Sequence, residues 1–192
     1  MAMWDRLKDQ AKNLQQTQSA RAGGGHGSAG PGLGGGHDRG TASSGGSKAQ
    51  LIGLLKSQLA SARTELKSGA YRDASMAMCA LVATADGSVE PAERQRMEEL
   101  IVSNEVLQNF PADQLRQRFN QHVDRMLADF ATGRAEALRE IAKAGKKPVE
   151  ARAVVQTGIV VAGADGHFDS SEQAAVRDAC ATLGLSPAEF GV

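Results

Sequence analysis

The sequence predicts an all-α protein, a compact bundle of about seven helices built on two related helix-turn-helix units. Apolar residues recur at helical spacing throughout residues 51–183, and no useful stretch alternates between apolar and polar residues as a strand does. Prolines stand at positions where helices commonly begin. A short acidic motif occurs twice, at Asp86 and again at Asp165, each time after an apolar stretch.

Composition divides the chain into three parts. We expect an amphipathic helix over residues 1–16, a Gly/Ser-rich disordered linker over 17–47, and a helical domain over 48–192. Twelve of the 22 glycines lie between residues 18 and 48. Such a segment buries too little apolar surface to offset the entropy lost on ordering, which is why we assign it as a linker.

The helices of the domain are placed by their apolar positions and by the glycines and prolines between them. We expect, in order, a helix from Leu51 through Leu66 that stops near Gly69, one from Tyr71 to Asp86, and one opened by Pro91. The fourth helix begins at Pro111 and has Leu127 and Phe130 on its apolar face, and a short fifth helix lies between Gly133 and Gly145. A sixth helix begins at Pro148, a seventh runs from Asp169 to Gly184, and a last turn passes through Phe190.

Charge and composition argue against several classes of protein. There are 22 basic and 22 acidic residues, whereas a nucleic-acid-binding domain normally has a basic excess, so we expect no nucleic-acid partner. The sequence has no apolar run of membrane-spanning length and no apolar signal segment at its start. We therefore expect a cytoplasmic protein. Cys79 and Cys180 lack metal-type spacing and are predicted to be buried thiols.

The repeated motif is the main candidate site. Residues 85–93 are Ala-Asp-Gly-Ser-Val-Glu-Pro-Ala-Glu, and residues 164–172 are Ala-Asp-Gly-His-Phe-Asp-Ser-Ser-Glu. The two copies keep an Asp-Gly turn, an apolar residue and two later acids in register. The six acidic positions are Asp86, Glu90, Glu93, Asp165, Asp169 and Glu172.

Part of this spacing matches the second half of an EF-hand loop, in which the last Glu binds Ca²⁺ through both oxygens. The first two acidic ligands of an EF-hand are missing, because Val82 and Thr84 occupy their places in the first copy and Val161 and Gly163 in the second. The repeats are therefore not true EF-hands.

Two interpretations of the acids compete. Acids at the start of a helix are favoured by capping and by the helix dipole, which accounts for Glu90, Glu93 and their counterparts in the second copy. The same argument fails for Asp86 and Asp165, which close the preceding helices, where the dipole disfavours an acid. Carboxylates on both sides of a tight turn, beside terminal helix carbonyls, favour a hard cation. We therefore predict that the six acids bind a divalent metal ion such as Ca²⁺, in one shared site or two.

The doubled turn, each copy at the end of an apolar helix, resembles the bacterial tellurite-resistance TerB family over roughly residues 68–190. The resemblance implies an all-helical domain with an acidic, metal-binding cluster, to which the same six acidic residues correspond. It also implies a role in a membrane-associated stress response, beside a TerC-like membrane protein and TerD-like calcium-binding proteins. It implies nothing about the linker or the leading helix.

The leading helix has its own pattern. Met3, Trp4, Leu7, Ala11 and Leu14 lie on one stripe, and charged residues of both signs occupy the rest of the surface. This pattern suits a helix in the membrane interface, and it equally suits a helix that docks into a groove on a partner or on its own domain. Both alternatives stay open.

We expect no catalysis. General acid–base or nucleophilic chemistry usually needs a His, Cys, Ser or Lys beside such carboxylates. His167 lies in the second turn, but its counterpart in the first is Ser88, and His122 is predicted to be a packed, hydrogen-bonded residue. These arguments favour a metal-binding stress-response protein at the cytoplasmic face of the membrane. The alternative is a metal-independent interaction module or scaffold that uses its acidic face to bind a partner.

Overall fold

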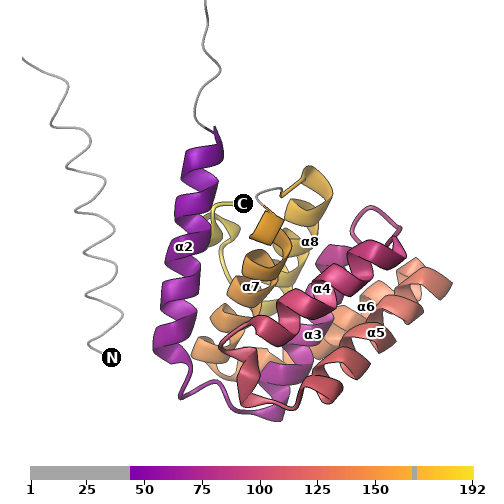
Figure 1. Ribbon diagram of the computed structural model, residues 1–192, viewed down its shortest axis with the longest axis horizontal. Coiled ribbons are helices and arrows are strands. Elements are labelled where there is room, and N and C mark those ends of the chain that lie inside the picture. Colours follow the sequence, from indigo (N-terminus) through magenta and orange to yellow (C-terminus); the bar gives the residue numbers. More distant parts are fainter. Residues whose placement is uncertain (1–43, 166–167) are drawn as a thin grey trace, which may run out of the picture. The chain divides into compact units, whose positions relative to one another are not determined.

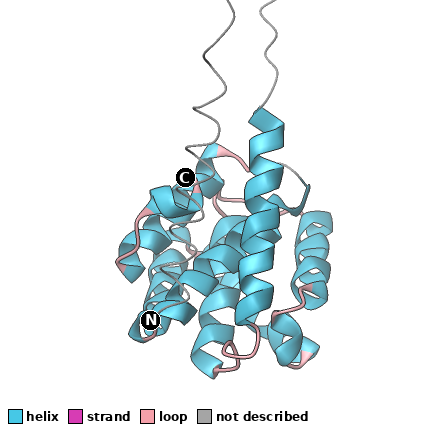
Figure 2. Cartoon of the chain, turned by 90° about the vertical axis from the view of Figure 1, so that its left-hand side faces the viewer, coloured by secondary structure: helices cyan, strands magenta, loops and turns pink. Residues whose placement is uncertain are grey.

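The computed structural model describes residues 44–165 and 168–192, with side chains from residue 48 onward except that of Asp165. The predicted leading helix over residues 1–16 and residues 17–43 of the predicted linker lie outside this description. Within the described residues the chain forms seven α-helices and four short 3₁₀-helices, with no strand (Figures 1 and 2). The predicted all-α bundle is confirmed.

The helices follow one another with short connections. The α-helices are α2 (Ser44–Ala62), α3 (Gly69–Ala83), α4 (Pro91–Ser103), α5 (Ala112–Ala128), α6 (Phe130–Ala142), α7 (Pro148–Ala162) and α8 (Ser170–Leu183). The 3₁₀-helices are η1 (Leu107–Asn109), η2 (Lys143–Lys146), η3 (Gly163–Asp165) and η4 (Pro187–Phe190).

Helix α3 is the centre of the domain. It packs against α5, α6, α7 and α8, and every residue from Ala74 to Ala83 is buried. Helix α7 is almost as completely buried and packs directly against α3. Both helices are apolar on nearly all sides, which is the pattern expected of a helix surrounded by others. Figure 1 shows the remaining helices arranged around this pair, with α2 along one side.

The two copies of the repeat are in register in secondary structure as well as in sequence. Helices α3 and α7 both have 15 residues, and a shift of 79 positions places Gly69 on Pro148 and Ala83 on Ala162. The same shift places the first residue of α4, Pro91, on the first residue of α8, Ser170. Each unit is therefore a buried helix, a short turn and a partly exposed helix.

A buried carboxylate joins the beginnings of α3 and α7. Glu150, which is 3% exposed, accepts a hydrogen bond from Ser68 Oγ at 2.9 Å and one from Lys147 Nζ at 2.9 Å. Ser68 is also the N-cap of α3, since its Oγ accepts from Tyr71 N. Deeper between the same helices, the Tyr71 hydroxyl lies 2.8 Å from Thr157 Oγ1.

The first predicted helix has the wrong bounds. It begins at Ser44, inside the predicted linker, and it ends at Ala62 instead of continuing through Leu66. Leu66 is nevertheless fully buried, on the segment that leads to α3. Asn109 Nδ2 donates hydrogen bonds to the carbonyls of Arg63 and Leu66, at 3.0 and 3.2 Å. These bonds satisfy backbone acceptors that a longer helix would have paired internally.

The boundary between α5 and α6 was also predicted wrongly. Asp129 ends α5 and caps α6, because its carboxylate accepts from Thr132 N at 3.1 Å and from Thr132 Oγ1 at 2.8 Å. Phe130 therefore begins α6 instead of extending the apolar face of α5, and it is 39% exposed. Leu127, near the end of α5, is 46% exposed, so it does not belong to the buried face of that helix. Gly133, predicted to precede α6, lies inside it.

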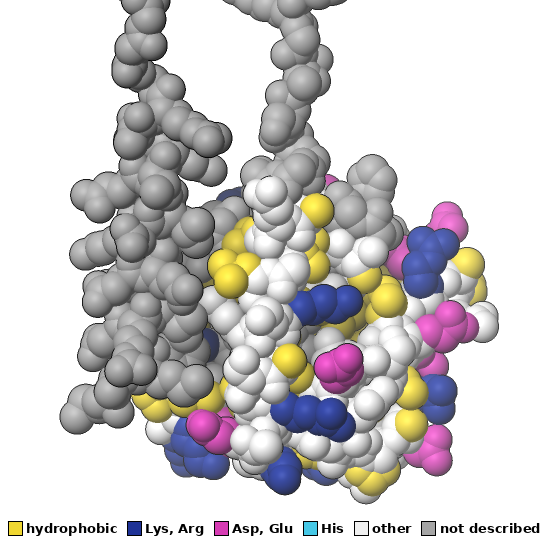
Figure 3. Space-filling view, turned by 60° about the vertical axis from the view of Figure 1, so that its left-hand side comes forward, with side chains coloured by type: hydrophobic (Ala, Val, Ile, Leu, Met, Phe, Trp, Pro, Cys, Tyr) yellow, Lys and Arg dark blue, Asp and Glu magenta, His cyan; other side chains and the backbone are white. Residues whose placement is uncertain are grey.

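The surface that carries α2 mixes charges of both signs. Figure 3 shows basic and acidic side chains interspersed on this face, with apolar side chains beside the N-terminal part of the helix. Leu54 on α2 is 53% exposed. Both cysteines are buried and unpaired, as predicted. Among the described helices, none is long and apolar enough to cross a membrane.

Candidate functional site

The first acidic turn connects α3 to α4. Gly87 has a φ of 89°, a conformation that favours glycine, and its N–H donates to Thr84 O at 2.9 Å. Asp86 Oδ1 accepts hydrogen bonds from Ser88 N at 2.9 Å and from Ser88 Oγ at 3.2 Å. The Asp86 carboxylate thus stabilises its own turn, in the manner of an Asx-turn.

The acids that start α4 do not cap it. Glu90 is the N-cap residue, but its side chain makes no capping hydrogen bond, and Glu93 lies in the first turn of the helix. Neither carboxylate has a hydrogen bond or ion pair with another described residue. The capping interpretation therefore fails for this copy, apart from the general attraction of the helix dipole for acids.

The second acidic turn behaves differently. Asp169 Oδ1 accepts from Ser171 N at 2.7 Å and from Glu172 N at 2.9 Å, and Glu172 Oε2 accepts from Asp169 N at 2.7 Å. This reciprocal pair is a capping box, so the helix-start interpretation holds for α8. The side chain of Asp165 lies outside the described residues, as do Gly166 and His167.

The structure brings acids of both copies to one place. A hollow of about 280 Å³ lies where α4, the end of α7 and the start of α8 meet. Glu90 and Glu93 line it from α4, and Glu172 lines it from α8. Asp86 and Asp169 do not line it. We call this place the acidic hollow; its remaining lining residues are Ala83, Ala92, Arg96, Met97, Leu100, Val161 and Ala162.

Arg96 is a member of the acidic hollow that sequence reasoning missed. It lies three residues after Glu93 on α4, so the helical spacing alone places the two side chains on neighbouring positions. Its guanidinium offsets part of the negative charge of the three carboxylates. The other lining residues of the hollow are apolar.

The carboxylate oxygens of the acidic hollow are suitable ligands for a hard cation, but the acidic side chains do not lie close enough together to coordinate one. Carboxylate oxygens are the ligands that Ca²⁺ and Mg²⁺ prefer. Among the described residues, however, no group of three or more His, Cys, Asp or Glu side chains is close enough together to hold a metal ion. An ion in the acidic hollow would have to draw the exposed side chains of Glu90 and Glu93 inward.

His122 differs from its prediction. It lies on α5, remote from the acidic turns in sequence, and its Nδ1 is buried with no hydrogen-bond partner among the described residues. The imidazole is therefore packed but not satisfied. Burial lowers the pKa of His122 below its ordinary value, and the positive charge of Arg125 lowers it further, against the opposite effect of Glu140, Glu136 and Asp73.

Comparison with known proteins identifies one family. The family model described as "Tellurite resistance protein TerB" matches residues 72–192, more than half of the chain. The matched range contains both acidic turns and helices α4 to α8, with nearly all of α3, and it leaves out α2. Searches among curated proteins and among solved structures gave no match.

Proposed function

The chain belongs to the tellurite-resistance TerB family, and from this we propose that it is a non-enzymatic stress-response protein whose acidic hollow binds a divalent metal ion. One observation carries the proposal: Glu90 and Glu93 from the first copy of the repeat and Glu172 from the second line the same hollow. A role of the acids in helix capping alone would not require the two copies to converge.

The physical argument rests on the negative charge of Glu90 and Glu93. Three carboxylates face one hollow, and Arg96 supplies a single positive charge beside them. Glu90 and Glu93 have no protein partner among the described residues. A divalent cation in the hollow would offset the mutual repulsion of these like charges. Glu90, Glu93 and Glu172 would hold the ion, with water completing the six to eight oxygens that Ca²⁺ takes.

Of the other three predicted ligands, Asp86 and Asp169 do not coordinate the ion directly in this proposal. Asp86 and Asp169 hold their own turns together through hydrogen bonds, so each contributes mainly by shaping the site. The proposal for Asp165 rests on the sequence repeat alone. The lining of the acidic hollow offers carboxylates and one guanidinium within the described residues, without a thiol or an imidazole, and this supports a binding role over catalysis.

The test is a metal-dependent melting experiment on the full chain. Ca²⁺, Mg²⁺ or Mn²⁺ should raise the melting temperature relative to EDTA, since an ion bound only by the folded state stabilises it by about 2.7 kcal/mol at 100 times its dissociation constant. The double substitution Glu90→Gln with Glu93→Gln should abolish the rise. Glu99→Gln is the matched control, an exposed carboxylate on the same helix that lies outside the hollow.

The result also decides between the two functions. If no divalent ion changes the melting temperature of the parent chain, the acidic hollow is left as the contact surface of a metal-independent interaction module. If the ions act equally on the parent and on the double variant, the ion binds elsewhere. The pair Asp86→Ala and Asp165→Ala then tests the turns themselves.

We further propose that the protein works at the cytoplasmic face of the membrane. The support is the amphipathic pattern of residues 1–15 together with family membership, which suggests a TerC-like membrane protein and TerD-like calcium-binding proteins as partners. A Gly-rich linker of about 30 residues would have a root-mean-square reach of about 30 Å, enough to hold the domain near a surface without orienting it.

The membrane proposal is tested with anionic vesicles. The intact chain should co-sediment with them, and deletion of residues 1–15 should abolish this. The fluorescence of Trp4, the single tryptophan, should shift to the blue when the helix enters lipid. Unchanged fluorescence, with vesicle binding that survives the deletion, would contradict a lipid anchor; a protein partner would then be sought through the same apolar stripe.

A further inference from the structure

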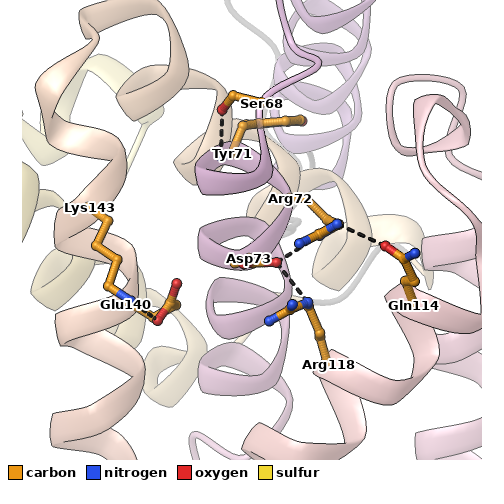
Figure 4. A network of polar contacts seen from close by, with 8 residues as sticks. All are labelled: Ser68, Tyr71, Arg72, Asp73, Gln114, Arg118, Glu140 and Lys143. Atoms are coloured by element: carbon orange, nitrogen blue, oxygen red, sulfur yellow. Dashed lines mark hydrogen bonds and ion pairs between the residues drawn. The ribbon is translucent and has the colours of Figure 1, made fainter.

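A second polar site lies between α3 and α5, on residues that the acidic motif does not include. Arg72 and Asp73 come from the beginning of α3, and Arg118 comes from the middle of α5. Figure 4 shows both arginines directed at the single carboxylate of Asp73, with Gln114 on the far side of Arg72. The two arginines, Arg72 and Arg118, are 46 positions apart in the sequence and come from different helices.

The two guanidinium groups are held side by side by one oxygen atom. Arg72 Nε lies 2.7 Å from Asp73 Oδ1, and Arg118 Nε lies 2.9 Å from the same atom. Arg72 and Asp73 are each only 18% exposed, so this contact is partly shielded from water. Two positive charges share one negative charge, and the cluster therefore keeps a net positive charge.

Arg72 is fixed from two further directions. Its Nη1 donates to Gln114 Oε1 at 2.8 Å. Its guanidinium carbon also lies 6.0 Å from the centre of the Phe110 ring, at the limit of a cation–π contact. A guanidinium with this many partners loses little further freedom when it binds a ligand, which favours binding.

Arg118 has hydrogen-bond donors that no described residue accepts from. Only its Nε is paired within the described residues, so both Nη groups remain available. Arg118 is one of the residues that line a hollow of about 460 Å³. We call it the Arg/Gln hollow; it is lined by Arg72, Gln114, Gln117, Arg118 and Gln121. The amides of Gln117 and Gln121 likewise have no partner among the described residues.

This combination is specific in its chemistry. The lining contains arginines and glutamines, which offer many N–H donors, and no acid. Asp73 does not line the hollow, and its Oδ1 orients both arginines. The paired N–H groups of a guanidinium fit two oxygens of a phosphate-like anion. Such charge-assisted hydrogen bonds are stronger than those between neutral groups. An apolar or cationic ligand would leave these donors unpaired.

We propose that the Arg/Gln hollow binds a phosphate-like oxyanion, as a free ion or as the anionic group of a small molecule. Arg118 contacts the anion through its two Nη groups, Arg72 adds positive charge, and Gln117 and Gln121 donate from one side. Asp73 is a positioning residue. The site is independent of the acidic hollow, because no residue lines both.

The experiment is an NMR titration of the full chain with inorganic phosphate at constant pH and ionic strength, against chloride. The Nε–H signals of Arg72 and Arg118 should shift saturably with phosphate and much less with chloride. O-Phosphoserine and tellurite serve as further probes, which distinguish a phosphate monoester and a different oxyanion from the free phosphate ion. Saturable binding of any of the three supports the site.

Substitutions test whether the Arg118 guanidinium is responsible for anion binding. Arg118→Gln should lower the affinity for the bound anion about tenfold, since it removes a charge-assisted contact. Arg116→Gln is the matched control: it lies on the same helix, is similarly exposed at 44% against 41%, and pairs with Glu98 and Asp113 outside the hollow. It should change the affinity less than about twofold. Circular dichroism confirms that each variant folds.

The proposal is overturned if none of the three oxyanions gives a saturable shift at Arg118. It is also overturned if Arg116→Gln weakens binding as much as Arg118→Gln does, because a general loss of positive charge would then explain the effect. Arg118→Lys should recover only part of the lost affinity, since lysine restores the charge but not the fork.

Discussion

Gly133 in α6 lies directly against the main chain of Met126 in α5. A Cβ atom at position 133 would stand 2.6 Å from Met126 N and 2.7 Å from Met126 Cα, far inside van der Waals contact. The two helices can approach this closely only because residue 133 has no side chain. The contact lets α5 and α6 pack against each other around the capped corner at Asp129.

Gly133→Ala should therefore destabilise the protein by about 1–3 kcal/mol, because backbone atoms cannot move aside as a side chain would. Urea denaturation measures the change. Gly53→Ala is the control. This glycine lies in α2, and among the described residues nothing outside its own stretch of helix lies within 4 Å of the position that a Cβ atom would take, so the substitution should stabilise by about 0.5–1 kcal/mol. Equal effects of the two substitutions would contradict the close approach.

Asp169→Ala should cost about 1 kcal/mol of stability, measured in EDTA so that no metal contributes, because it removes the capping side chain of α8. Its counterpart in the first copy, Glu90, makes no capping bond, so Glu90→Ala should change stability by no more than about 0.5 kcal/mol. A similar cost at both positions would mean that the two copies are capped alike.

Glu150→Ala should cost about 1–3 kcal/mol, because Ser68 and Lys147 lose their shared acceptor at the beginnings of α3 and α7. The comparison is Glu140→Ala, which breaks a Lys143 pair of the same i,i+3 spacing at the surface. That change should cost about 0–1 kcal/mol. Thermal or urea unfolding of the two variants side by side gives the answer, and a smaller cost at Glu150 would refute its bridging role.

Alkaline pH should destabilise the fold through Tyr71. Burial raises the pKa of Tyr71 from 10.0 to about 12, with its hydrogen bond to Thr157 acting in the opposite direction. The unfolded chain loses the phenolic proton first, so the contribution of Tyr71 to stability is complete below pH 10 and is lost as the pH rises toward 12.

This tyrosine is the only one in the chain, so tyrosinate absorbance reports its ionisation directly. The folded protein should titrate near pH 12, and the urea-unfolded protein near pH 10. Tyr71→Phe should reduce the loss of unfolding free energy over this interval. It should not remove it, because burial also raises the pKa of Cys79 to about 12. A folded-state midpoint near 10 would contradict the burial of the hydroxyl.

The sequence by itself determined the class of fold, the repeat and the family. These depend on local chemistry: apolar positions at helical spacing, Pro91 and Pro148 at helix starts, and an Asp-Gly turn that recurs after 79 residues. Local signals failed where a distant partner replaced them. Beyond Ala62, where α2 ends, Asn109 binds backbone carbonyls that a longer helix would have paired internally. Gly133 lies inside α6, where it permits the close approach of α5.

Only the tertiary structure decided how the acids are used. All six belong to one repeated pattern, yet Glu90 and Glu93 line the acidic hollow, Asp86 and Asp169 are bound within their own turns, and Glu172 does both. No spacing rule could place Arg118 of α5 beside Asp73 of α3, or leave His122 packed without a partner among the described residues. A sequence specifies which side chains share one helix face, whereas the packing of helices decides which faces meet and hence which charges become neighbours.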